Sequence, residues 1–237
     1  MQFLTGVVEG FYGQPWTQAQ RIELFGQLRA WGMNAYFYAP KDDLKHRAIW
    51  RELYHDAELA TLAELVGKCA EQQLTFFYGL SPGLDIHFSN PAELECIKRR
   101  FQQLQQVGAE NFALLFDDLP GKMTEEDQAE FASVAAAQCS VTNAIFDWLR
   151  EQHPTARLLF CPTPYCDLMD RQDLAGEDYL ETIGRLLPPE VDVLWTGPDI
   201  VSREIPVDSI RKLAERIGRP PLLWDNLHAN DYDLRRA

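Results

Sequence analysis

Two adjacent aspartates, Asp117 and Asp118, directly follow an unbroken apolar run at residues 112–116. Such a run has the length of a strand that is buried on both faces, as in a parallel sheet. A polar turn in which one aspartate caps the next helix would explain the pair. However, burying carboxylates is costly, and two acidic groups beside one bond are the minimum set for glycoside cleavage. Like charges this close do not both ionise easily, so one of the two pKa values should rise, which suits a general acid.

Strand-like and helical segments alternate seven times along the chain. Strands are expected at residues 3–9, 34–38, 74–79, 112–116, 157–161, 191–195 and 221–224. Helices are expected at residues 18–31, 56–73, 91–108, 124–150, 179–187 and 208–217, with Thr17 as an N-cap and Pro91 at a first helical position. No linker or low-complexity stretch interrupts the series, which predicts one domain of parallel βα units.

Two architectures fit this series, an open doubly wound sheet and a (β/α)8 barrel of TIM type. No strand is followed by Gly-x-Gly-x-x-Gly, which disfavours the nucleotide-binding sheet. Polar and aromatic residues gather after the strands, where a barrel builds its active site. We therefore expect a barrel. Because only about seven units are visible, residues 1–237 should form a single catalytic domain that is incomplete at its C-terminal end, with open edges on the first and seventh strands.

The residues that follow the strands should converge on one pocket. They are Gly10, Tyr12, residues 41–43, Asp85, Asp117, Asp118, Tyr165, Gly197, Trp224 and residues 226–231. This set combines carboxylates, an ammonium group, amides and aromatic rings. Carboxylates can bind hydroxyl groups and aromatic faces can stack on pyranose rings, so the set predicts a sugar site.

Seven stretches, in order along nearly the whole chain, resemble a known family. They are residues 6–13 with Pro15-Trp16, 38–43 with 45–47, 81–85, 113–118, 161–166, 195–198 and 224–233. Together they resemble the catalytic domain of glycoside hydrolase family 84, the O-GlcNAcase family of β-N-acetylglucosaminidases. The resemblance implies retaining hydrolysis of terminal β-linked N-acetylglucosamine, in which the substrate's own acetamido oxygen attacks the anomeric carbon and forms an oxazoline.

The resemblance also implies the roles of the site residues. Asp117 would hold the acetamido N–H, and Asp118 would protonate the leaving oxygen and then activate water. Substrate-binding roles fall on the Gly10 backbone and Lys41 at the 3-hydroxyl, Tyr165 and Asn226 at the acetamido group, Trp224 as a wall, and Asp231 at the 4- and 6-hydroxyls. Family domains continue past the stretch 224–233 through another strand and helix, which carry an asparagine that touches the sugar, and this chain supplies neither.

Without the resemblance, blander interpretations of these residues stay open. Lys41 could be a solvated loop lysine, Tyr165 and Trp224 could be core aromatics, and Asp231 could cap a turn. Residues 42–43 are interpreted as fixing their loop.

Other polar residues are given structural roles. Glu9, at the end of the first strand, is expected to brace the fold by pairing with Lys41 or Arg47. The histidines at positions 46, 87 and 228 fit no local ligand spacing, so no metal is expected. No cofactor is expected either.

The composition limits partners and location. Lys and Arg number 22 against 36 Asp and Glu, a net charge of −14, which disfavours nucleic acid and anionic membranes as partners. Five cysteines without a C-x-x-C pair, and the lack of a signal peptide or membrane-length apolar run, favour reduced thiols in a cytoplasmic protein. The oligomeric state is open.

Two other functions are weighed. The chain could be a GlcNAc-binding module that kept the pocket without turnover. Hyaluronan cleavage is disfavoured by the negative charge. The natural aglycone, whether protein Ser/Thr, a chitin fragment or another glycan, does not follow from the sequence. The DNA downstream of the codon for Ala237 would be the most informative observation.

Overall fold

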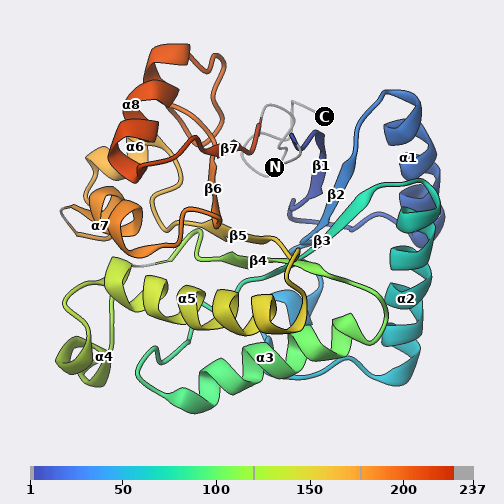
Figure 1. The fold of residues 1–237 in the computed structure, drawn as a ribbon, viewed down its shortest axis with the longest axis horizontal. Helices are drawn as coiled ribbons and strands as arrows, with labels where there is room; N and C mark the ends of the chain where they lie inside the picture. The colour runs from blue at the N-terminus through green and yellow to red at the C-terminus, as the bar shows by residue number, and fades with distance from the viewer. Residues whose placement is uncertain (1–2, 120, 177, 227–237) are drawn as a thin grey trace.

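The computed structural model describes residues 3–119, 121–176 and 178–226, and its core is one curled sheet of seven strands. The strands are β1 (Gly6–Glu9), β2 (Ala35–Tyr38), β3 (Thr75–Leu80), β4 (Asn111–Leu115), β5 (Leu158–Cys161), β6 (Asp192–Trp195) and β7 (Leu222–Leu223). All neighbouring pairs are parallel, and the spatial order follows the chain order (Figure 1). A doubly wound sheet would reverse its order at a switch point. The expected partial (β/α)8 barrel is therefore confirmed.

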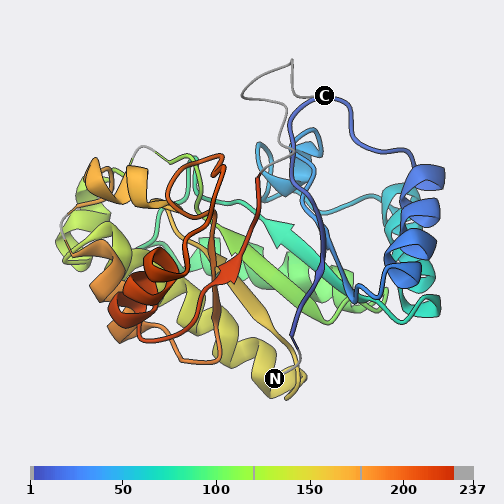
Figure 2. The same ribbon diagram turned by 90° about the horizontal axis from the view of Figure 1, so that it is seen from above.

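Helices cover the outer, convex side of the sheet, as Figures 1 and 2 show. They are α1 (Gln18–Ala30), α2 (Asp56–Glu71), α3 (Pro91–Gln105), α4 (Glu125–Glu130), α5 (Val134–Gln152), α6 (Asp167–Arg171), α7 (Tyr179–Leu186) and α8 (Val207–Ile217), with a short 3₁₀ turn, η1 (Leu44–His46). Thr17 caps α1 with a full capping box, and Pro91 begins α3, as predicted.

The core has two parts, because successive strand residues point to opposite faces. Phe112 and Leu114 of β4 pack outward against the helices, whereas Ala113 and Leu115 point into the curl of the sheet. All four are fully buried. Burial on both faces explains the unbroken apolar run from which the strand was predicted.

The expected single helix over residues 124–150 is wrong, because the structure has two helices there. α4 ends at Glu130, and Phe131 is in an extended conformation. Ser133 then begins α5 by accepting a hydrogen bond from the Ala136 N–H, at 3.2 Å. A new N-cap starts a new helix even where the apolar pattern continues. The helix α6 and the turn η1 were not predicted, since each is shorter than two helical turns.

The two outer strands have open edges within the described residues. β1 pairs only with β2, and β7 pairs only with β6. All five cysteines are free thiols, and four of them are buried. No helix in the described part of the chain has the length and apolar character needed to cross a membrane.

Candidate active site

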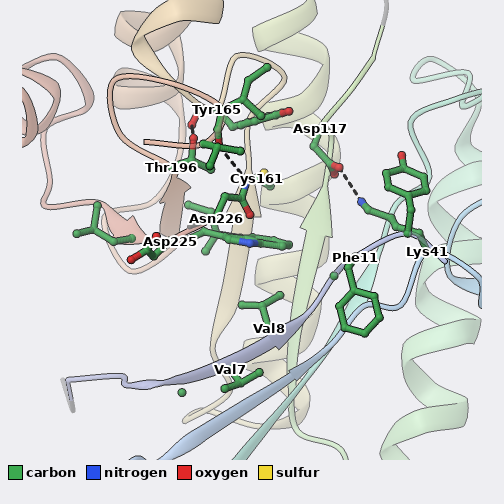
Figure 3. Close-up of a pocket in the computed structure, with 18 of the residues that line it drawn as sticks. Val7, Val8, Phe11, Lys41, Asp117, Cys161, Tyr165, Thr196, Asp225 and Asn226 are labelled. Carbon is green, nitrogen blue, oxygen red and sulfur yellow. Dashed lines mark hydrogen bonds and ion pairs between the residues drawn. The ribbon is translucent and has the colours of Figure 1, made fainter. Parts of the chain in front are cut away.

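The parallel register brings the residues after several strands to one edge of the sheet. Leu80 of β3 is level with Leu114, and Leu115 of β4 is level with Cys161. A cavity of about 940 Å³ opens at this edge and extends into the curl (Figure 3). Eight residues expected from the sequence line it: Gly10, Tyr12, Lys41, Asp117, Asp118, Tyr165, Trp224 and Asn226. Convergence of these residues on one pocket is confirmed.

Asp117 is buried and held by two cations. Its Oδ2 accepts hydrogen bonds from Lys41 Nζ at 2.7 Å and from Arg47 Nη1 at 3.4 Å. Figure 3 shows the Lys41 and Asp117 side chains pointing toward one another. Burial would raise the pKa of Asp117, but the charges of Lys41 and Arg47 hold it below its ordinary value. The other oxygen, Oδ1, is buried and has no hydrogen-bond partner among the described residues.

Asp118 occupies a different environment. It is exposed, and its backbone lies in the left-handed region with φ of 55°. Aspartate is one of the few residues that visit this region, so the turn suits the residue found there. Its Oδ1 accepts a hydrogen bond from the Tyr165 hydroxyl at 2.9 Å. Burial and the Asp118 charge raise the pKa of Tyr165, so the phenol stays protonated and remains a donor.

Lys41 is a pocket residue and not a solvated loop lysine. Only 5% of its side chain is exposed, and its ammonium lies 5.9 Å from the centre of the Tyr12 ring. Burial would lower the pKa of Lys41, but Asp117 raises it above its ordinary value. The site therefore contains a charged ammonium beside an ionised carboxylate.

One wall of the cavity is built by Trp224, directly after β7. Its N–H donates to the Trp195 carbonyl at 2.9 Å, and its ring lies 5.7 Å from that of Phe37. Gly10 approaches so closely that a Cβ there would lie 2.6 Å from Trp224 Cζ2. Asn226 is tied to the loop after β6, since its Nδ2 donates to the Ile200 carbonyl at 3.0 Å.

Several expected placements are wrong. Glu9 does not pair with Lys41 or Arg47; it forms a bidentate ion pair with Arg21, with N–O distances of 2.8 Å. Arg21 extends from α1, the helix that follows β1 directly, so it reaches the end of that strand first. The role of Glu9 as a brace is confirmed, with a different partner.

Asp85 and Gly197 were expected in the pocket but do not line it. Asp85 accepts from Trp50 Nε1 at 2.8 Å and pairs with Arg51 at 2.6 Å. It lies five residues beyond the end of β3, so the chain has already turned away. Gly197 has φ of 102°, and a Cβ there would meet Ser202 Oγ at 2.7 Å, so it serves a turn. Asp231 lies outside the described residues.

The loop after β2 is fixed by its own polar side chains, as predicted for Asp43. Asp43 Oδ1 accepts from the Lys45 N–H at 3.0 Å, and Oδ2 accepts from the Tyr38 hydroxyl at 2.9 Å and from the Tyr54 hydroxyl. Asp42 is exposed and does not line the cavity.

His46 is buried close behind the site. Its Nδ1 lies 2.8 Å from the Gly79 carbonyl, and burial together with the charge of Lys41 lowers its pKa to about 4. No group of three or more His, Cys, Asp or Glu side chains in the described chain could hold a metal ion.

Arg47 is the site residue whose position sequence reasoning missed. It belongs to the family-like stretch 45–47, but the only contact expected for it was with Glu9, whereas it contacts Asp117. Its signal was available, because it stands in the same post-strand loop as Lys41. The sequence did not show which of the nearby carboxylates the Arg47 guanidinium would contact.

Comparisons with known proteins agree with this geometry. A family model described as beta-N-acetylglucosaminidase matches residues 5–237. Two curated relatives, the proteins named Protein O-GlcNAcase of Mus musculus and Rattus norvegicus, are each 49% identical over 235 residues, 99% of this chain. The chain spans about a quarter of their length, 25% in each case. A solved structure, that of a mutant of the Thermobaculum terrenum O-GlcNAc hydrolase, superposes with a TM-score of 0.90 at 34% identity. That match covers 96% of this chain and 48% of the other.

Proposed function

Because this chain belongs to the β-N-acetylglucosaminidase family, we propose that its pocket releases terminal β-linked N-acetylglucosamine with the help of the substrate's own acetamido group. In this mechanism the acetamido carbonyl oxygen attacks the anomeric carbon while the bond to the aglycone breaks. An oxazoline forms, and water then opens it with retention of configuration. The protein supplies no nucleophile, so its residues have to orient the acetamido group and transfer protons.

The observation that carries the proposal is the unused oxygen of Asp117. Oδ1 is buried beside the cavity with no partner in the described chain, while Oδ2 is held by Lys41. Buried acceptors almost always have a donor. An acetamido N–H is a donor of the right kind, and the ionised carboxylate would stabilise the positive charge that develops as the oxazoline forms.

Asp118 is proposed as the general acid and base. Its exposure leaves it open to the solvent side, where an aglycone leaves and water enters. In the first step it gives a proton to the leaving oxygen, and in the second it takes one from the attacking water. The Tyr165 hydroxyl, at 2.9 Å from Oδ1, would hold the carboxyl group in one orientation.

The remaining residues are proposed to bind the sugar. Lys41 and the Gly10 backbone would contact the 3-hydroxyl side, Tyr165 and Asn226 the acetamido group, and Trp224 the ring. Asp231, outside the described residues, would take the 4- and 6-hydroxyls. The names of the relatives suggest protein-linked O-GlcNAc as a substrate, and this too is a proposal.

We propose that residues 1–237 form one catalytic barrel domain whose open strand edges are closed by an eighth βα unit. The support is the pair of strand edges, on β1 and β7, that have no partner in the described chain. Turnover by residues 1–237 should be compared with turnover by a longer protein in which an eighth strand and helix complete the barrel. Equal activity of the two would contradict the proposal.

The experiment that tests the mechanism varies the leaving group. In an active protein, Asp118→Asn should retain much of its rate on a β-GlcNAc glycoside of an acidic phenol. It should lose about 10²–10⁴-fold on an alkyl glycoside, whose leaving oxygen needs a proton. Asparagine is preferred to alanine because it tolerates the left-handed backbone at this position.

Asp117→Asn provides the contrast. It removes support for the acetamido nucleophile, which every substrate needs, so its loss should be uniform across leaving groups. The reverse pattern, or equal sensitivity in both variants, would show that the roles are wrongly assigned. Calorimetric binding of N-acetylglucosamine without any turnover would favour a binding module instead.

A further inference from the structure

Arg47 presents a second cation to the same oxygen of Asp117 that Lys41 already holds. Its guanidinium lies 3.4 Å from Oδ2, and only 10% of its side chain is exposed. The two cations differ in one respect. Lys41 lines the cavity, whereas Arg47 does not. A ligand can therefore reach Lys41 directly, while Arg47 approaches Asp117 from behind.

The η1 turn that ends at Arg47 is held by two hydrogen bonds to the carbonyls of the residues just before Arg47. The Ser81 N–H donates to the His46 carbonyl at 2.9 Å, and Arg100 Nη1 donates to the Lys45 carbonyl at 2.8 Å. These contacts tie η1 to the end of β3 and to α3. Arg47 is the C-cap residue of η1, so its backbone position is set by those anchors. Such support is what a group needs if it is to hold another side chain in place.

We infer that Arg47 is a positioning residue, which holds Asp117 through Oδ2 and keeps it ionised while the sugar occupies Lys41. The inference rests on the proposed function, in which the Lys41 ammonium also donates a hydrogen bond to the 3-hydroxyl of the sugar. Without Arg47 as a second cation, Asp117 would then remain buried while its ion pair with Lys41 is weakened. A buried carboxylate in that situation tends to take up a proton. A protonated Asp117 would no longer stabilise the positive charge of the oxazoline.

The other groups that face Asp117 do not replace this charge. His46, from the same loop, is uncharged at neutral pH because burial and Lys41 lower its pKa. Burial and Asp117 raise the pKa of the Cys161 thiol, and burial and Asp118 raise that of Tyr165, so both remain neutral. Asp118 adds no positive charge.

The direct test is a titration of the Asp117 carboxyl carbon by NMR in the free protein. Arg47→Gln should raise the pKa of Asp117 by about one unit, at the low end of the effect of a neighbouring arginine. Arg47→Lys, which keeps the charge, should restore most of the difference. In a Lys41→Met background the same Arg47→Gln change should have a larger effect, since Arg47 is then the remaining cation.

Arg51→Gln is the matched control. Arg51 lies four residues further along the chain and pairs with Asp85 and Glu93, at 2.6 and 2.8 Å, away from the site. This variant should leave the pKa of Asp117 unchanged. An unchanged pKa in Arg47→Gln, or an equal shift in Arg51→Gln, would overturn the inference.

Kinetics provide a second readout that a purely structural role would not move. The substrate is a chromogenic phenyl β-GlcNAc glycoside. In Arg47→Gln, the acidic limb of the pH profile of kcat/KM should shift upward by about one pH unit. At pH values below this limb kcat/KM should fall about tenfold, and at pH values above it kcat/KM should change little. A loss that is uniform across pH would contradict the inference. Absence of turnover in the wild type would count against the proposed function alone, because the titration does not depend on turnover.

Discussion

The ends of β1 and β4 both carry a buried carboxylate paired with cations, yet the two carboxylates are completed differently. Glu9 uses both oxygens within the fold. Oε2 accepts from Arg21 Nε and the Tyr36 hydroxyl, and Oε1 accepts from Arg21 Nη2 and the Trp16 N–H. Asp117 uses only Oδ2, and Oδ1 has no partner in the described chain.

The difference separates architecture from chemistry. A buried carboxylate whose acceptors are all occupied ties elements together, here β1, β2, α1 and the loop before α1. A buried carboxylate with one vacant acceptor is costly to keep unless a ligand completes it. Burial and ion pairing alone do not tell the two apart. For these two residues the distinguishing feature is an acceptor oxygen without a partner, on a carboxylate that also lines the cavity.

The most direct test of this difference is to neutralise Asp117 and Glu9 in turn. Asp117→Asn should lower kcat by about 10²–10³-fold, the loss seen when one preorganised electrostatic partner is removed. Glu9→Gln should instead lower the free energy of unfolding by about 3–5 kcal/mol, because Arg21 would keep a buried charge without its partner. Urea denaturation and steady-state kinetics on both variants measure the two effects.

In Glu9→Gln, kcat of the folded protein should stay close to the wild-type value. Comparable losses of kcat in both variants would mean that the end of β1 also takes part in the chemistry. A loss of stability without loss of kcat in Asp117→Asn would remove the distinction altogether.

The second prediction concerns His46, a buried histidine whose charge would act on Asp117 at the end of β4. Its folded pKa of about 4 lies below the ordinary value of 6.5, so the unfolded chain binds more protons between these pH values. The contribution of His46 to the free energy of unfolding is therefore fully present above pH 6.5 and is lost as pH falls toward 4. The loss over that window is about 3 kcal/mol.

His46→Asn should flatten the fall in unfolding free energy between pH 6.5 and 4, since an asparagine amide can still donate to the Gly79 carbonyl. Urea denaturation across this range measures the slope. His87→Asn, at an exposed position, serves as the control and should keep the wild-type slope. An unchanged slope in His46→Asn would mean that the histidine titrates normally in the folded protein.

Much of the fold could be predicted from the sequence because local patterns govern it. The apolar run before Asp117 predicts β4, and Thr17 predicts the start of α1, since each signal lies within a few residues of the element. Ser133 shows the limit of this reasoning. Its cap divides the expected long helix, but a serine within an apolar helical pattern is ambiguous until its side chain is seen to accept from Ala136.

The membership of the site was predicted better than its pairings. Lys41, Asp117 and Tyr165 were expected together because residues after parallel strands share one edge of the sheet. Which cation meets which carboxylate depends on side-chain reach across elements far apart in sequence. For that reason the Arg21 partner of Glu9 and the Arg47 contact to Asp117 appeared only in the structure.

The smallest effect is expected for a substitution of Gly10, which follows Glu9 at the end of β1. A methyl group at Gly10 would lie 2.6 Å from Trp224 Cζ2 and 3.2 Å from Val8 Cγ1, so the wall of the pocket would have to shift. With Gly10 and Trp224 in their proposed roles against the sugar, a displacement of a fraction of an ångström should cost about tenfold in kcat/KM for Gly10→Ala. Gly26→Ala, in α1 with no atom within 4 Å of the new methyl, should leave kcat/KM unchanged.

A double-mutant cycle decides whether the Gly10→Ala loss acts through the Trp224 ring. Trp224→Phe shortens the aromatic side chain and eliminates the outer indole atoms Cζ2 and Cη2 that the new methyl group would meet, so the cost of Gly10→Ala should be smaller in that background. An equal cost in both backgrounds would mean that Gly10 matters through its backbone and not through its fit against the wall. In that case the end of β1 would contribute to the site independently of Trp224, and its contrast with the end of β4 would rest on Glu9 alone.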